Sequence, residues 1–248
     1  MLLEEKNAVI YGGGGSIGGA VARAFAREGA KVFLAGRTRT TLEEVRFAGG
    51  VAETAEIDAL DEMAVDQHVD AVAAEAGGID ISFNLITHPH EHGTPMAEMA
   101  LEEFTRPVET AVRTTFLTWR AAARHMIRQG FGVILAFGGS GDPMRDYYLG
   151  GTRVAFEAIE SMRRQLAAEL GPHGVRVVTL RTGGVPESLP EGIDGREAIV
   201  EKTIVAPTML GRAATLEDVG HVAAFVASDR ARTMTAATAN ISCGALVD

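Results

Sequence analysis

The sequence predicts an α/β fold in which a doubly wound parallel sheet carries helices on both faces. Apolar runs typical of buried strands alternate with segments of helical periodicity along the whole chain. Parallel strands need a crossover, so this alternation implies right-handed βαβ units. A length of 248 residues fits one domain, and no linker or internal repeat divides the chain.

Composition limits the classes of partner. Hydrophobic residues make up 46% of the chain, which is enough for a sizeable core, and the net charge is -10. Such acidity argues against nucleic acid or an anionic membrane as a partner, because both require a positive field. The single Cys243 excludes an intrachain disulfide and a cysteine-rich zinc site. With neither a signal-peptide pattern nor an apolar run of about 18 residues, we expect a soluble cytoplasmic protein.

A glycine-rich turn stands near the start of the chain, at Tyr11–Ala20. The apolar run Ala8–Ile10 precedes it, and apolar residues at helical spacing follow it from Val21 to Ala26. A strand, a glycine-rich turn and a helix in this order deliver backbone N–H groups to a pyrophosphate, and glycines let the backbone approach closely. The turn therefore predicts nucleotide binding through Gly12, Gly14, Ser16, Ile17 and Gly18.

Six further segments have the apolar, strand-like composition of sheet elements. We predict these strands at Lys31–Ala35, Ala52–Ile57, Ile79–Ile86, Gly132–Phe137, Val175–Leu180 and Ala239–Ser242.

The helices between these strands are predicted from apolar spacing and from start and stop signals. Thr41–Glu44 and Thr215–Asp218 have capping-box patterns, and each predicts a helix start. A proline inside a helical pattern bends or starts the helix, as expected of Pro107. The longer predicted helices are Asp61–Ala76, Leu101–Gln129, Thr152–Leu170 and the one that runs to Ala227.

The segment Gly183–Leu210 departs from this alternation. It contains three prolines and several acidic residues, so we expect it to be irregular. A long irregular insertion in a compact α/β domain is usually a lid or a binding loop.

Several motifs occur in the order typical of one family. The glycine loop is similar to a T-G-x-x-x-G-x-G pattern, with Tyr11 for the threonine and Ser16 for the middle glycine. Further matches are Ile79–Asn84, Glu169–Val177, Met209–Arg212 and Gly244–Asp248. Over nearly its whole length the chain thereby resembles the short-chain dehydrogenase/reductase family. The resemblance implies a Rossmann-type fold and oxidoreductase chemistry on a carbonyl or alcohol, with a small molecule as substrate or ligand. It also implies a homo-tetramer or homo-dimer that forms through the long helices and the C-terminal segment.

The end of the second predicted strand indicates which dinucleotide is bound. In dinucleotide folds an acidic residue there accepts from the ribose hydroxyls of NAD, whereas an arginine accommodates the 2′-phosphate of NADP. Here Gly36 is followed by Arg37 and Thr38. We therefore predict NADP, with NAD less favoured; the alternative is that Arg37 and Arg39 are solvated loop cations.

The resemblance adds further cofactor residues. It implies that Asp58 contacts the adenine, although a capping or loop aspartate is an equal alternative. It also implies that Asn84 supports the centre of the sheet near the cofactor. Gly183 and Val185 would line the nicotinamide end, where Thr182 replaces the usual proline.

The side chains that the family uses for proton transfer are absent. A tyrosine, which has an unperturbed pKa near 10, normally has a lysine four residues later that favours its anion. Counting along the motifs places Ala111, Gly139, Thr152 and Phe156 at the asparagine, serine, tyrosine and lysine positions. No lysine occurs between Lys31 and Lys202, so no shift of alignment restores one there.

Two nearby hydroxyls are candidate substitutes. If the helix begins early, Tyr148 lies one turn before Thr152 and could hold a substrate oxygen together with Ser140. The alternative is that Tyr148 is a packing or interface aromatic. The alternating His88, His90 and His92 could in principle hold a metal, but a polar loop is favoured and no metal is expected.

Three functions remain open from the sequence. The first is an oxidoreductase with a non-standard active site. The second is a catalytically inactive nucleotide-binding or scaffold subunit, because function depends on the site and not on the fold. The third is a non-redox enzyme that uses the same pocket.

Overall fold

The structure, a computed structural model, describes residues 1–49, 52–87, 93–138, 148–192 and 194–247. These residues form a seven-stranded sheet in the order β3-β2-β1-β4-β5-β6-β7, and every neighbouring pair is parallel. The order reverses between β1 and β4, as the predicted doubly wound topology requires. The strands are β1 (Asn7–Tyr11), β2 (Lys31–Gly36), β3 (Ala52–Glu56), β4 (Ile81–Asn84), β5 (Gly132–Gly138), β6 (Val175–Arg181) and β7 (Ala237–Asn240).

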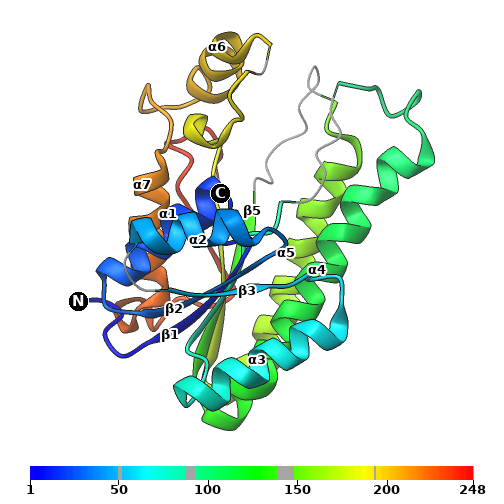
Figure 1. Cartoon of the computed structure of the whole chain (residues 1–248). Helices are drawn as coiled ribbons and strands as arrows, with labels where there is room; N and C mark the ends of the chain where they lie inside the picture. The colour runs from blue at the N-terminus through cyan, green and yellow to red at the C-terminus, as the bar shows by residue number, and fades with distance from the viewer. Residues whose placement is uncertain (50–51, 88–92, 139–147, 193, 248) are drawn as a thin grey trace.

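Helices cover both faces of this sheet (Figure 1). One face carries α1 (Ser16–Arg27), α2 (Arg39–Gly49) and α7 (Leu216–Ala227). The other face carries α3 (Glu62–Ala76), α4 (Leu101–Gln129) and α5 (Gly150–Leu170).

Alternate residues along the strands pack into two separate cores, one on each face of the sheet. In β1, Val9 and Tyr11 join the core under α3, α4 and α5, whereas Ala8 and Ile10 join the core under α1 and α7. Parallel strands buried on both faces are nearly continuous apolar runs, which explains why these strands are recognisable in the sequence.

Several element boundaries differ from the prediction. Helix α2 begins at Arg39, because the Thr41 hydroxyl donates to the Thr38 carbonyl at 2.9 Å and does not cap a helix. The second capping box is confirmed, since Thr215 Oγ1 accepts from the Asp218 N–H at 3.1 Å. Pro107 lies inside α4. Strand β4 is shorter than predicted, and β7 lies two residues earlier.

The lid segment Gly183–Leu210 is more regular than predicted. It contains the 3₁₀ turn η2 (Pro186–Ser188), the short helix α6 (Arg196–Ile199) and the π-helical segment η3 (Val200–Val205). This segment rises above the carboxyl edge of the sheet (Figure 1). The Glu187 carboxylate joins it to α7 by accepting from the Leu216 N–H at 2.6 Å.

Across the described ranges, no helix is both long enough and apolar enough to cross a bilayer.

Candidate functional site

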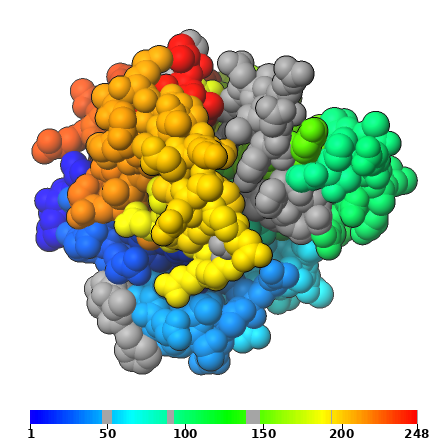
Figure 2. Space-filling view, turned by 90° about the horizontal axis from the view of Figure 1, so that it is seen from above, coloured from blue at the N-terminus to red at the C-terminus, as the bar shows by residue number. Residues whose placement is uncertain are grey.

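A cleft of about 1090 Å³ opens at the carboxyl edge of the sheet, where α/β sheets of this topology bind ligands. Figure 2 looks down on this edge, with the lid in yellow and orange and the start of α4 in green on opposite sides. Nine of the residues predicted from the sequence line the cleft. They are Ser16, Ile17, Gly18, Asn84, Ala111, Thr152, Phe156, Gly183 and Val185.

The turn between β1 and α1 needs glycine at two positions. Gly12 has a φ of +75°, and a Cβ there would collide with the Leu85 backbone. A Cβ on Gly18 would collide with the Gly12 carbonyl, because the first turn of α1 packs directly on the loop. The glycines thus bring the start of α1 against the sheet edge.

The start of α1 has the features of an anion-binding helix N-terminus. The first N–H groups of a helix have no intrahelical acceptor, and Gly15 at the N-cap supplies no side-chain oxygen. The first turn contains no acidic side chain, so the positive end of the helix dipole faces the cleft without compensation. Ser16, Ile17 and Gly18 line the cleft at this point, and this donor set fits the pyrophosphate of a dinucleotide.

Asn84 joins the end of β4 to α4 at the point where the strand order reverses. Its amide nitrogen donates to Thr118 Oγ1 at 3.2 Å, and its Oδ1 accepts from the Ile86 N–H at 2.9 Å. The side chain is buried, and both contacts position the floor of the cleft.

The segment after β6 forms another part of the floor. The Thr182 N–H donates to the Gly138 carbonyl at 3.2 Å. A Cβ on Gly183 would lie 2.8 Å from Ala245 Cβ, so this glycine permits the C-terminal segment to approach.

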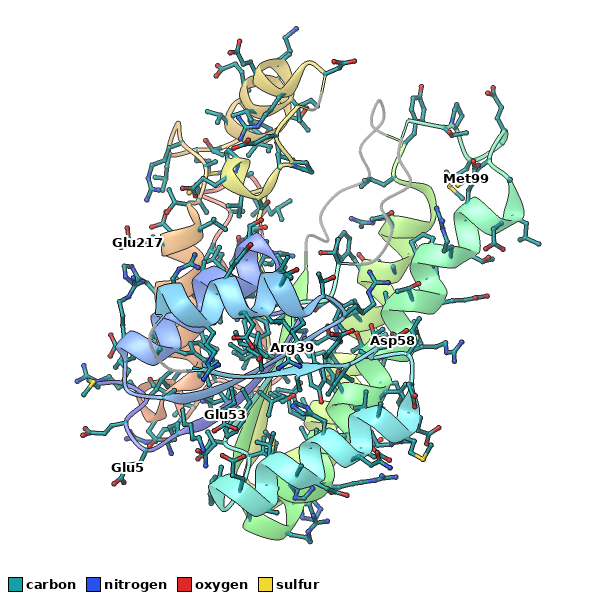
Figure 3. All side chains as sticks on the ribbon, in the orientation of Figure 1. Glu5, Arg39, Glu53, Asp58, Met99 and Glu217 are labelled. Atoms are coloured by element: carbon teal, nitrogen blue, oxygen red, sulfur yellow. The ribbon has the colours of Figure 1, made fainter. Side chains whose placement is uncertain are left out.

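The other predicted cofactor residues lie outside the cleft walls. Gly12 and Gly14 form the inner side of the turn, where a Cβ on Gly14 would collide with Thr41. Arg37 and Thr38 are exposed just after β2. Asp58 follows β3 (Figure 3), and its Oδ1 accepts from the Leu60 N–H at 3.0 Å. That contact gives Asp58 a role in the turn before α3.

The wall expected to be catalytic is formed by α4 and α5. Ala111, Thr152 and Phe156 all face the cleft from these helices. The Thr152 side chain is 1% exposed, and its hydroxyl has no hydrogen-bond partner among the described residues. This wall can orient a substrate oxygen, but its described side chains include neither a tyrosine nor a lysine.

The expected geometry of Tyr148 is not found. Helix α5 begins at Gly150, so Tyr148 lies before the helix and not one helical turn from Thr152. It is 41% exposed with a φ of +50° and does not line the cleft. Gly139, Ser140, His88, His90 and His92 lie outside the described residues. Within the described ranges, no group of three or more His, Cys, Asp or Glu side chains could hold a metal ion.

One polar cluster in the cleft was not predicted. Glu160 accepts from Arg163 Nε at 3.1 Å and Nη2 at 2.8 Å, and its other oxygen accepts from the Thr179 hydroxyl. Helical spacing could have revealed it, because Phe156, Glu160 and Arg163 share one face of α5.

Comparisons with known proteins agree with this arrangement. A sequence model of the family described as enoyl-(acyl carrier protein) reductase matches residues 13–245. The short-chain reductase protein NovJ of Streptomyces niveus is 30% identical, and the match covers 97% of this chain and 94% of that protein. The 2,5-dichloro-2,5-cyclohexadiene-1,4-diol dehydrogenase of Sphingobium indicum is 31% identical, with 94% of each chain covered.

A solved structure is similar over the same extent. The short-chain type dehydrogenase/reductase from Mycobacterium marinum superposes with a TM-score of 0.86 at 29% identity, covering 99% of this chain and 97% of that one. With the sheet order, the glycine turn and the cleft at the carboxyl edge, these matches lead to one conclusion. The chain belongs to the short-chain dehydrogenase/reductase family.

Proposed function

We propose that this protein is an NADP(H)-dependent oxidoreductase that interconverts a carbonyl and an alcohol in an active site without a tyrosine–lysine pair. The observation that carries the proposal is one continuous cleft. The anion site at the start of α1 and the Thr152 wall of α5 both open into it. A dinucleotide held at its pyrophosphate would therefore reach the wall that holds the substrate.

The preference for NADP rests on the end of β2. Gly36 and Arg37 place no carboxylate there to accept from ribose hydroxyls or to repel a 2′-phosphate. The exposed Arg37 offers a planar fork of donors that matches a phosphate. Arg39 is also exposed, and its Nε lies 4.0 Å from the Glu43 carboxylate.

The residues of the wall would orient the substrate. When bound, the reduced nicotinamide supplies a hydride to the carbonyl carbon. Thr152 would donate its hydroxyl hydrogen to the substrate oxygen, which gives this buried hydroxyl the partner it lacks among the described residues. Because a threonine hydroxyl is not an acid in the physiological range, the proton for that oxygen would come from water. Positioning then supplies most of the rate enhancement by the protein.

A second candidate is a nucleotide-binding protein without turnover. The observation that favours it is the apolar character of Ala111 and Phe156, which face the cleft and can neither donate nor accept a proton. Such a protein would keep the anion site at α1 and lose the chemistry.

Steady-state kinetics with purified protein separate the two candidates. NADPH oxidation is followed with a panel of aldehydes, ketones and enones, and NADPH affinity is measured by calorimetry on the same sample. Saturable NADPH oxidation with at least one carbonyl supports the oxidoreductase. Micromolar binding of NADPH with no oxidation across the panel would overturn it in favour of the second candidate.

A further inference from the structure

Arginines gather on one wall of the cleft, along α5 and the end of β6. The described lining contains two carboxylates, those of Glu157 and Glu160. It contains four arginines: Arg153, Arg163, Arg164 and Arg181. We call these four residues the arginine wall. The chain as a whole has a net charge of -10, so the wall is opposite in sign to the rest of the molecule. A ligand entering the cleft would meet a locally positive field there.

Arg163 is the buried member of the wall. Its side chain is 4% exposed, and its Nε and Nη2 donate to Glu160. Its Nη1 is also buried and has no acceptor among the described residues. A guanidinium always carries its charge and has five N–H donors, so one arm of the fork remains available. Burying a donor of a charged group without an acceptor is unfavourable, which points to a partner supplied by a ligand.

Glu160 fixes the orientation of Arg163. One of its carboxylate oxygens accepts from two nitrogens of Arg163, and the other accepts from the Thr179 hydroxyl on β6. The carboxylate is therefore engaged with the protein, and the guanidinium is held before a ligand arrives. Such pre-orientation lowers the entropy that binding must overcome.

The other arginines of the wall lie on α5 and at the end of β6. Arg181 lies two residues beyond Thr179 on β6, so it projects from the same face of the strand. Arg153 lies 3.1 Å from the Glu157 carboxylate near the start of α5. Arg164 follows Arg163 and is exposed.

We infer that the arginine wall binds an oxyanion, a carboxylate or a phosphate, carried by the ligand that occupies the substrate side of the cleft. Arg163 Nη1 donates to it at the buried end, and the exposed Arg164 adds positive charge. The substrates would then be acidic carbonyl or alcohol compounds and not neutral ones. This inference rests on the proposed function only for the statement that the ligand is a substrate.

The single tryptophan of the chain offers a direct reporter, because Trp119 lines the same cleft. Succinate, inorganic phosphate and neutral succinamide are titrated while Trp119 fluorescence is recorded, with and without saturating NADP⁺. Calorimetry confirms each binding constant. We expect succinate or phosphate to bind saturably in the presence of NADP⁺ and succinamide not to bind. The succinate and phosphate arms identify the type of oxyanion. Equal binding of succinate and succinamide, or no binding of either anion, would overturn the inference.

A matched pair of variants tests the role of Arg163. Arg163→Lys keeps a cation for Glu160 but removes the second arm of the fork, and it should weaken anion binding about tenfold or more. Arg27→Lys, at the end of α1 and away from the cleft, should leave binding unchanged. If Arg163→Lys does not fold, the variant Arg164→Gln tests the inference instead. Loss of this exposed charge should weaken anion binding about threefold at low salt. Unchanged anion binding in the folded variant would contradict the inference.

The same samples keep this inference separate from the proposed function. Anion binding that depends on Arg163, without NADPH oxidation by any acidic carbonyl compound, would leave the oxyanion site standing and overturn the oxidoreductase. Turnover of neutral ketones as efficiently as of the matching keto acids would support the oxidoreductase and overturn the inference that its substrates are acidic.

Discussion

Thr152 and Phe156 occupy the positions where the family has its proton-transferring tyrosine and lysine. A phenol beside an ammonium group exchanges a proton near neutral pH, whereas a threonine hydroxyl beside a phenyl ring can only donate or accept a hydrogen bond. The proposed chemistry therefore depends on orientation by Thr152.

The variant Thr152→Val tests this role. Valine matches threonine in shape and removes the buried hydroxyl that has no partner among the described residues, so the fold should be retained. Loss of one neutral hydrogen bond in the transition state should lower kcat/KM about three- to tenfold. Kinetics with the best carbonyl substrate provide the measurement, and an unchanged kcat/KM would exclude contact between Thr152 and the reacting oxygen.

Arg37 carries the prediction of cofactor choice. Arg37→Ala should weaken NADPH binding about ten- to a hundredfold and leave NADH binding unchanged, because a charge-assisted bond to the 2′-phosphate is lost. Arg39→Ala is the matched control, since Arg39 is oriented toward Glu43. Calorimetric titrations measure all four affinities. An NADPH affinity that survives in Arg37→Ala would show that the residue is a solvated loop cation.

His68 makes stability depend on pH. Burial lowers its pKa from 6.5 to about 4, and its ring stands edge-on to Tyr11 at 6.0 Å between centroids. The unfolded chain therefore binds the proton more readily, so stability is complete above about pH 6.5 and is lost as the pH falls toward 4. Urea unfolding should show a loss of about 2 kcal/mol from this group between pH 7 and pH 5.

His68→Phe is the control for this prediction. It keeps a ring against Tyr11 and removes the titrating group, so its stability should depend less on pH over the same interval. An identical pH dependence in the two proteins would contradict the assignment to His68.

At the scale of elements, the residue at the start of α1 affects both the stability of the helix and the proposed binding of NADPH. Gly15 is an N-cap in extended conformation, with a φ of -81° and a ψ of 166°, which aspartate and asparagine also adopt. Gly15→Asp should cap the helix and keep or slightly raise stability, while its carboxylate repels the pyrophosphate. We expect NADPH affinity to fall at least tenfold in this variant, in line with a lost charge-assisted bond.

Gly15→Asn separates the effect of charge from that of shape. It caps the helix equally well but is neutral, so it should bind NADPH more tightly than Gly15→Asp. Calorimetry and thermal unfolding of the two variants supply the comparison. Equal affinities would mean that the start of α1 does not contact the cofactor.

The predictability of the elements differs for physical reasons. Strands and long helices were recognisable because burial on both faces imposes apolar runs and helical spacing. The sequence predicts the start of α2 at Thr41, because Thr41 and Glu44 have the spacing of a capping box. In the structure the Thr41 hydroxyl donates backward to the Thr38 carbonyl, and the helix begins at Arg39. The prolines of the lid predict irregular structure. The part of the lid between Pro190 and Pro207 nevertheless forms helical turns in α6 and η3.

The candidate site was predictable only in part. The glycine turn and Asn84 follow from local motifs, so their positions in the cleft could be expected. The contact between Glu160 and Thr179 joins α5 to β6 across 19 residues, and no local motif encodes it. Only the fold brings these two side chains together.

At the scale of the whole molecule, α4 and α5 expose large apolar side chains among charged ones. Phe116 on α4 is 51% exposed and Val154 on α5 is 40% exposed. A second copy of the chain that packs on these helices would bury this apolar area, and each Å² buried stabilises the assembly by about 25 cal/mol. We therefore predict a homo-oligomer that forms through α4 and α5.

Light scattering coupled to size exclusion tests the prediction. Phe116→Glu places a charge in the expected interface and should shift the protein toward smaller species. Met63→Glu, on the exposed side of α3, is the control for a charge added outside the interface. A monomer at micromolar concentrations, before any substitution, would contradict the prediction.

The architecture brings the parts of the proposed reaction to one edge. The reversal of strand order between β1 and β4 opens the cleft, the glycine turn supplies its anion site, and α4 and α5 supply the opposite wall. Hydride transfer in such a cleft depends on the cofactor and on positioning, and neither requires a tyrosine–lysine pair.

Transfer of isotope from the cofactor tests this central claim most directly. The protein is incubated with NADPH that carries deuterium on one face of nicotinamide C4, in parallel with the opposite epimer, and with a panel of acidic carbonyl compounds. The account predicts that deuterium from only one epimer appears at the carbonyl carbon of an alcohol product by mass spectrometry. Bound NADPH with no deuterium in any product would contradict it.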